Sequence, residues 1–175
     1  TLDVSAWQSD DAALVAHPVM RSLRTVSGVG GGVFASERAL GLENVAAMDG
    51  VRLTLGEGFL IMGGIEIADA VTTMDVMAEL GAPIVNTIVM EQDRGRAFDQ
   101  FGIYAAMAAE RGMLACLEYM PMMWPINVGE AAEFVATSGA ANARVLIDAM
   151  HFFRGGSSAA DLAGIDPACI GYVQI

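Results

Sequence analysis

Two carboxylates and an amide, each at or near the end of a short apolar run, form the first candidate site in the sequence. Glu118 and Asp148 directly follow such runs, and Gln174 lies near the end of a third run. If the runs are neighbouring strands, the two acids repel each other unless a proton or a cation lies between them. Carboxylate and amide oxygens favour Mn²⁺ or Mg²⁺, with Zn²⁺ and Co²⁺ as further candidates. The spacing fits this metal site and structural salt bridges to Arg52 or Arg154 equally well.

A histidine and three further acids also follow apolar runs. His151 lies three residues after Asp148, so it can face the same cavity as a ligand, a hydrogen-bond donor or a proton carrier. A histidine that only packs at the rim of the core is the alternative. Glu57, Glu91 and Asp93 follow earlier runs, and solvated loop positions explain these three acids at least as well as a function does.

The apolar runs belong to a repeating unit of strand and helix. Predicted strands begin at residues 51, 83, 113, 144 and 170, and the unit therefore repeats about every 30 residues, the length of a βαβ unit. Apolar residues at helical spacing predict helices over 66–80, 96–111 and 129–136, each followed by a glycine, and a short helix capped by Ser158. Asn127 and Glu130 predict a cap at the start of the third helix.

Repeated parallel units are compatible with an open doubly wound sheet or a closed (β/α)8 barrel. The even spacing favours the TIM barrel, but eight units need about 250 residues. We therefore expect a single α/β domain over residues 1–175 that is an incomplete TIM barrel, with C-terminal units missing. Residues 1–49 fit the repeat poorly, with weak strands at 2–7 and 28–35 and a weak helix at 36–48. At one mouth of such a barrel, the strand ends bring the candidate site residues together.

Composition excludes several classes of function. The net charge is −12, with 9 basic residues against 21 acidic ones, so a nucleic-acid partner is not expected. All nine basic residues are arginine, which leaves no lysine for Schiff-base chemistry. No apolar run reaches the roughly 20 residues of a membrane span. Two cysteines in apolar surroundings favour a reducing, cytoplasmic location, and the high apolar content favours a homo-oligomer.

Three segments together resemble one known family. CLEYMPMMWP, NARVLIDAMHFFRGG and IGYVQI, in this order, resemble the sugar phosphate isomerase/epimerase family of the xylose-isomerase-like TIM barrels. GVRLTLGEGFLI and MAELGAPIV are also similar to earlier strands of that family, so the resemblance covers roughly residues 50–175. The D-x-x-H-x-x-R block after a strand is moderately specific, and the ordered set of segments is stronger than any single one.

The resemblance implies roles for individual residues. Glu118 matches a glutamate that binds the metal and acts as an acid or base, and Asp148 matches a metal-binding aspartate. His151 matches a histidine that contacts substrate oxygens, and Arg154 matches an arginine that positions the substrate or a loop. Gln174 occupies a position where many members have a metal-binding histidine, so it keeps an oxygen donor but loses the imidazole. The last metal-binding glutamate of the family lies on a strand that this sequence does not reach.

These implications give a leading hypothesis and two alternatives. The leading hypothesis is a divalent-metal-dependent isomerase or epimerase that removes the proton alpha to the carbonyl of a sugar, a sugar phosphate or a related small polyhydroxylated compound. Glu118 and His151 are the expected catalytic residues, and His151, Arg154 and Glu57 are expected to bind substrate. The first alternative is a dehydratase similar to inosose dehydratases, and the second is a barrel without chemistry that serves as a binding module.

Overall fold

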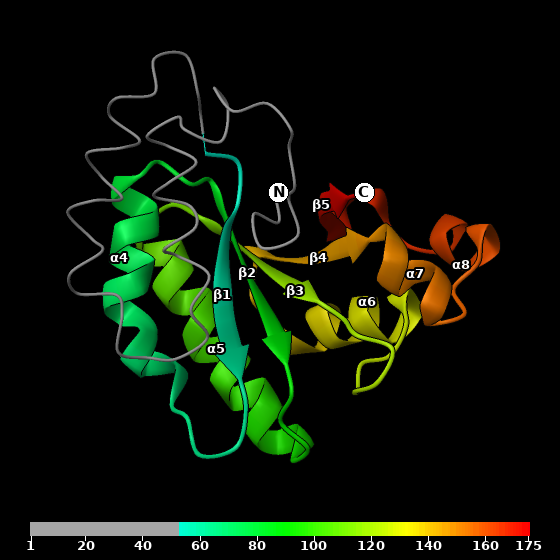
Figure 1. Ribbon diagram of the computed structural model, residues 1–175, viewed down its shortest axis with the longest axis horizontal. Coiled ribbons are helices and arrows are strands. Elements are labelled where there is room, and N and C mark those ends of the chain that lie inside the picture. Colours follow the sequence, from blue (N-terminus) through cyan, green and yellow to red (C-terminus); the bar gives the residue numbers. More distant parts are fainter. Residues whose placement is uncertain (1–52) are drawn as a thin grey trace, which may run out of the picture. The chain divides into compact units, whose positions relative to one another are not determined.

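Residues 53–175, the part of the chain that the computed structural model describes, form a parallel sheet with helices packed on it (Figure 1). The strands are β1 (Gly56–Ile61), β2 (Ile84–Val89), β3 (Leu114–Glu118), β4 (Ala143–Asp148) and β5 (Ile170–Gln174). The helices are η1 (Ile67–Ala70), α4 (Val71–Glu79), α5 (Arg94–Glu110), α6 (Val128–Ser138), α7 (Ala149–Arg154), α8 (Ala159–Ala163) and η2 (Pro167–Cys169).

The strands follow one another in space in the same order as in the sequence. The sheet order is β1-β2-β3-β4-β5, and every neighbouring pair is parallel. Each connection between strands is therefore a crossover that contains helix, as the predicted βα repeat requires. A doubly wound sheet would reverse its strand order partway through. The sequential order within the described residues instead matches part of a barrel.

The two faces of the sheet differ in what covers them. Val85, Leu117 and Val145 point to one face and are fully buried, and α5 and α6 pack on the sheet. Side chains alternate along each strand, so the residues between them point to the opposite, inner face. There a small apolar cluster forms, made of Leu55, Cys116 and Leu146 with the partly buried Ile84 and Tyr172. The inner face therefore holds a thinner apolar layer, and the candidate site lies on it.

An aromatic cluster fixes the loop that follows β3. The rings of Phe98 and Phe134 stack at a centroid distance of 4.5 Å, and Trp124 from the loop lies 5.3 Å from Phe134. The Arg94 guanidinium lies 4.4 Å above the Trp124 ring, a favourable cation–π distance. These contacts hold the loop against α5 and α6 beside the C-terminal end of β3.

Side-chain caps define where most of the helices begin. Asn127 caps α6 by accepting a hydrogen bond from the Glu130 N–H at 2.9 Å, and Ser158 forms a capping box with Asp161 at the start of α8. Both caps confirm predictions from the sequence. Asp93 caps α5, which begins at Arg94 rather than at residue 96. The helix predicted over 66–80 is divided into η1 and α4.

The position of β1 differs from the sequence prediction. The expected strand covers residues 51–55 with Glu57 after it, but β1 runs over Gly56–Ile61 and Glu57 is its second residue. Phe59 and Ile61 are almost fully buried and supply the apolar pattern of this strand. Two glycines argue against a strand in the sequence, yet Gly56 has a packing role, since a Cβ there would lie 2.8 Å from the Met77 sulfur on α4.

Some sequence predictions lie outside the described residues. These are the strands at 2–7 and 28–35, the helix at 36–48, the first two residues of the strand at 51–55 and Arg52 as an ion-pair partner. Among the helices of residues 53–175, none has the length and apolar character that a membrane crossing demands.

Candidate functional site

Glu118, Asp148 and Gln174 are the last residues of three adjacent strands. Glu118 ends β3, Asp148 ends β4 and Gln174 ends β5. Register pairs Glu118 with Leu146 and Asp148 with Gln174. Because paired residues of parallel strands point to the same side and Leu146 precedes Asp148 by two, all three side chains point to the inner face. The fold therefore brings the predicted carboxylates and the amide to one edge of the sheet.

Glu118 is a buried carboxylate with two different neighbours. Only 9% of the residue is exposed. Its Oε2 accepts a hydrogen bond from the Asn86 Nδ2 at 2.6 Å, and its Oε1 lies 3.7 Å from the His151 Nε2. The two carboxylate oxygens are thus distinguished, because one is held by a neutral amide and the other faces an imidazole.

The environment of Glu118 brings the protonation equilibrium of its carboxyl close to neutral pH. Burial raises the pKa of its carboxyl from an ordinary 4.5 to about 7, and the negative charges of Glu57 and Asp148 contribute to this rise. The hydrogen bond from Asn86 acts in the opposite direction because it favours the ionised form. A carboxyl group with a pKa close to neutral exchanges protons readily at physiological pH.

Asp148 positions the short helix α7, which carries His151. Its Oδ1 accepts a hydrogen bond from the His151 N–H at 3.0 Å and so caps α7. The sequence predicts a shared cavity for the two residues but does not predict this helix. The His151 Nδ1 and the Gln174 Oε1 are buried without a hydrogen-bond partner within residues 53–175. Two unsatisfied polar atoms at one sheet edge are unusual in a purely structural arrangement.

Of the two arginines that could form a salt bridge with Glu118 or Asp148, only Arg154 lies within the described residues, and it does not form one. Arg154 is the last residue of α7, is exposed, and forms no ion pair with Glu118 or Asp148 in the described part of the chain. Arg154 therefore does not neutralise the two carboxylates.

Glu57, the other predicted substrate-binding residue, is exposed in β1, and the pairing with β2 is irregular between Gly56 and Phe59.

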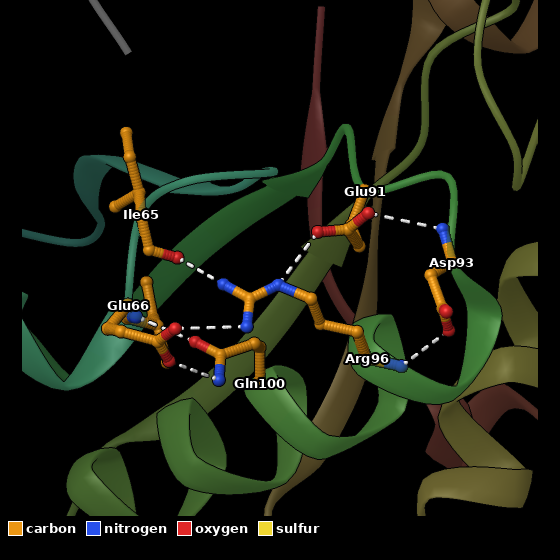
Figure 2. A network of polar contacts seen from close by, with 7 residues as sticks. Ile65, Glu66, Glu91, Asp93, Arg96 and Gln100 are labelled. Carbon is orange, nitrogen blue, oxygen red and sulfur yellow. Dashed lines mark hydrogen bonds and ion pairs between the residues drawn. The ribbon is translucent and has the colours of Figure 1, made fainter.

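Glu91 and Asp93 belong to a structural network instead of the site (Figure 2). The Arg96 guanidinium contacts Glu91 Oε2 and Glu66 Oε1, both at 2.9 Å, and donates to the Ile65 carbonyl at 2.8 Å. Asp93 accepts the Arg96 N–H as the cap of α5. These contacts tie the segment after β1 to the segment after β2. Sequence reasoning placed the two acids among the strand-end residues, but it did not identify Arg96 as their common partner.

Asn86 is a site residue that sequence reasoning missed. The segment containing it reads as a continuous apolar strand, and Asn86 lies in the middle of β2 with 3% exposure. The available signal was an amide within that run, since asparagine is depleted in strands and a buried amide needs a partner. Its partner, Glu118, is 32 residues away and follows only from the strand register.

The donor set fits a divalent cation in chemistry, although it is not a closed cage. Glu118, Asp148 and Gln174 offer oxygens, His151 offers a ring nitrogen, and the Gln174 and His151 atoms named above are unsatisfied. After burial, the negative charges of Glu57 and Asp148 raise the pKa of Glu118. A bound cation would offset this repulsion between carboxylates. Within residues 53–175, however, no three His, Cys, Asp or Glu side chains cluster at the spacing of a metal site.

Comparison with solved structures identifies the fold. Neither a protein-family model nor a curated protein matches the chain significantly. An AP endonuclease of family 2 from Brucella melitensis superposes with a TM-score of 0.67 at 16% identity, covering 79% of this chain and 63% of that one. The IolI protein with a bound zinc atom superposes with a TM-score of 0.65 at 18% identity, covering 75% of this chain and 55% of that one. D-Psicose 3-epimerase in the presence of D-fructose superposes with a TM-score of 0.65 at 16% identity, covering 78% of this chain and 57% of that one.

The chain spans less than two thirds of each of these three proteins. The TM-scores of 0.65–0.67 establish the fold, whereas identities of 16–18% leave the activity open. The expectation of an incomplete TIM barrel is confirmed by the sequential parallel sheet and by these neighbours. The described part of this chain has the fold of the xylose isomerase-like TIM barrels.

Proposed function

We propose that this chain carries much of the active site of a divalent-metal-dependent isomerase or epimerase for a polyhydroxylated carbonyl compound. The observation that carries the proposal is Glu118, a buried carboxylate that lies 3.7 Å from His151 at the C-terminal edge of a parallel sheet. In barrels of this kind that edge is where catalytic side chains gather. A raised carboxyl pKa beside a histidine is typical of acid–base sites.

Glu118, Asp148 and Gln174 would hold the cation through oxygen atoms, with His151 beside them. When bound, a divalent cation polarises a substrate carbonyl and so acidifies the carbon-bound proton next to it. Mn²⁺ or Mg²⁺ suits the three oxygen donors, and Zn²⁺ or Co²⁺ suits a site that also recruits the imidazole. The zinc atom in IolI is consistent with a divalent ion in this fold.

Glu118 and His151 would perform the proton chemistry. The Glu118 carboxylate would accept the proton alpha to the carbonyl through the oxygen that does not hold the cation, and the electron pair of the broken C–H bond would move onto the carbonyl oxygen to form an enediolate. The His151 Nε2 is the nearby donor that can hydrogen-bond this oxygen. Return of the proton to the neighbouring carbon, with that carbon's hydroxyl proton passing to the former carbonyl oxygen, would give an isomer. Protonation of the original carbon on its opposite face by a second donor would give an epimer. Arg154 and Glu57 are proposed to bind more distant substrate groups.

The same first step supports one further enzymatic outcome. If a hydroxyl beta to the carbonyl leaves instead of a proton returning, the product is that of a dehydratase. A non-catalytic barrel is the second alternative, and Gln174 favours it because the resemblance implies a histidine at this position. Phosphodiester cleavage in nucleic acid, suggested by the endonuclease neighbour, is disfavoured by the net charge of −12.

Asp148→Asn tests the metal site independently of the unknown substrate. We expect Mn²⁺ to bind the unaltered protein with one-to-one stoichiometry, and Asp148→Asn to weaken binding by about 10- to 100-fold. Asparagine still caps α7, so the helix that carries His151 is retained. Isothermal titration calorimetry after removal of bound metal gives the affinity. Asp75→Asn is the matched control and should bind Mn²⁺ normally, because Asp75 lies on α4 and pairs with Arg111, the residue directly after α5.

Two outcomes contradict the proposal. The first is an unaltered protein that folds but binds none of Mn²⁺, Mg²⁺, Zn²⁺ or Co²⁺. The second is an Asp148→Asn variant that binds Mn²⁺ as tightly as its Asp75→Asn control. Either result would favour the binding module. A homo-oligomer and a cytoplasmic location stay predictions from composition.

A further inference from the structure

Asn86 is placed to act on Glu118 from the adjacent strand. The register of β2 and β3 pairs Ile88 with Glu118, so Asn86 lies two residues earlier on the same inner face. Only 3% of Asn86 is exposed. The Asn86 Nδ2 donates to the Glu118 Oε2 at 2.6 Å, a short hydrogen bond of the charge-assisted kind.

We propose that Asn86 is a positioning residue that fixes the Glu118 carboxylate so that Oε1 is the oxygen available to a metal or a substrate. This inference rests on the function proposed above and adds a residue that neither the sequence motifs nor the resemblance assigns. Asn86 contacts neither His151 nor Asp148 through a hydrogen bond within the described residues. Its action on a ligand is therefore exerted through Glu118.

The orientation of Glu118 depends on the asymmetry of its two oxygens. A glutamate side chain has a freely rotating terminal carboxylate, and burial alone does not choose between its oxygens. The hydrogen bond from Asn86 holds Oε2 toward β2, and Oε1 then lies 3.7 Å from the Nε2 of His151 on α7. Because both strands belong to one sheet, the donor and the carboxylate are fixed relative to each other. Rigid support of this kind orients metal ligands in proteins.

The chemistry of the donor also matters. An arginine at this position would neutralise the carboxylate and compete with any bound cation. An amide donates a hydrogen bond without a positive charge, so the negative charge of Glu118 is retained for a ligand. Among residues 53–175, the arginines with ion pairs are Arg96 and Arg111, and their carboxylate partners are Glu66, Glu91, Asp75 and Glu110. Glu118 is thus oriented by a neutral group that adds no compensating positive charge to its ionised form.

A matched pair of variants on β2 separates positioning from simple structural support. Asn86→Leu removes the amide and keeps a branched side chain with the same number of heavy atoms. Thr87→Val removes another buried side-chain hydrogen bond on the same strand, from the Thr87 Oγ1 to the Phe59 carbonyl at 3.1 Å. Thr87 alternates with Asn86 and points to the face covered by helices. Both variants should lose some thermal stability, but only Asn86→Leu disturbs Glu118.

The measurement is the Mn²⁺ dissociation constant at one pH, obtained by calorimetry on each folded, metal-depleted protein. We expect Asn86→Leu to bind Mn²⁺ about tenfold more weakly than the unaltered protein, and Thr87→Val to bind within twofold of it. Equal affinities for the two variants would overturn the positioning role and leave the metal site intact. Failure of the unaltered protein to bind Mn²⁺ would remove the proposed function and this inference together.

Circular dichroism decides whether each variant is folded before the titration. If Asn86→Leu does not fold, Asn86→Ala removes the same donor without placing a large apolar side chain beside Glu118, and the same tenfold loss is expected. If neither variant folds while Thr87→Val does, Asn86 serves the stability of the sheet, and the positioning role is overturned.

Discussion

Glu118→Gln is expected to reduce proton abstraction from a substrate by about 10³-fold. Glutamine has nearly the shape of glutamate and can still accept the hydrogen bond from Asn86, so the sheet edge stays intact. It cannot act as the base, and it removes the negative charge from the proposed metal site. Loss of the base and loss of a ligand therefore act in the same direction, which makes this the largest effect that we expect on activity.

Deuterium exchange measures this step even though the product is not identified. The Mn²⁺-loaded protein is incubated in D₂O with free ketoses, including D-fructose and D-psicose, and with inososes. ¹H NMR then follows the loss of the proton alpha to the carbonyl. Isomerase, epimerase and dehydratase chemistry all begin with this exchangeable proton. Glu110→Gln is the matched control, because Glu110 is 75% exposed at the end of α5 and should leave exchange unchanged. Full exchange by Glu118→Gln would refute the role of Glu118.

The metal-free protein is expected to lose about 3 kcal/mol of stability through Glu118 as the pH rises from 4.5 to above 7. The folded state raises the pKa of this carboxyl from 4.5 to about 7, so the folded state binds the proton more tightly than the unfolded state does. Between these two values the unfolded chain releases the proton while the folded chain keeps it. The free energy of unfolding therefore falls with rising pH across this window and levels off above it.

The test is the free energy of unfolding, measured with urea in the presence of EDTA at about pH 5 and about pH 8. These two pH values span most of the window. Other groups also titrate between these pH values, so the informative quantity is the difference between variants. The unaltered protein and Glu110→Gln should lose about 2.5 kcal/mol more than Glu118→Gln does on going to the higher pH. A Glu118→Gln variant with the same loss as the unaltered protein would show that Glu118 is not held in a buried, carboxylate-rich environment.

Periodicity was sufficient to predict most of the sheet. The strands that became β2, β3, β4 and β5 carry apolar runs because helices cover their outer sides, and the glycine after each of α5 and α6 marks a helix end. The strand ends Glu118 and Asp148 followed directly from these runs. Local patterns decide such features, and a local reading is therefore adequate for them.

Features that depend on long-range packing were not predicted. The strand at 51–55 was misplaced because the sequence of β1 contains glycines, and the need for Gly56 lies in its contact with Met77 on α4. Gly171 in β5 is similar, since a Cβ there would lie 2.5 Å from the Cys116 sulfur on β3. Neither contact is visible without the register of the sheet and the placement of the helix.

Pairing explains what sequence reasoning missed at the site. The strand-end rule grouped Glu91 with Glu118, because both are acids after apolar runs. The difference between them lies in their partners, which are Arg96 for Glu91 and Asn86 with His151 for Glu118. Which acid pairs with an arginine and which faces neutral groups is set by side chains from other elements.

Anomalous diffraction from crystals containing Mn²⁺ would show whether Glu118, Asp148 and Gln174, gathered at one edge of the sheet, hold a divalent cation. We expect an anomalous peak within bonding distance of oxygens from all three side chains, with the Glu118 Oε1 as the ligand and Oε2 still bonded to Asn86. A peak at another place, or none at a Mn²⁺ concentration that saturates binding in solution, would refute this metal site.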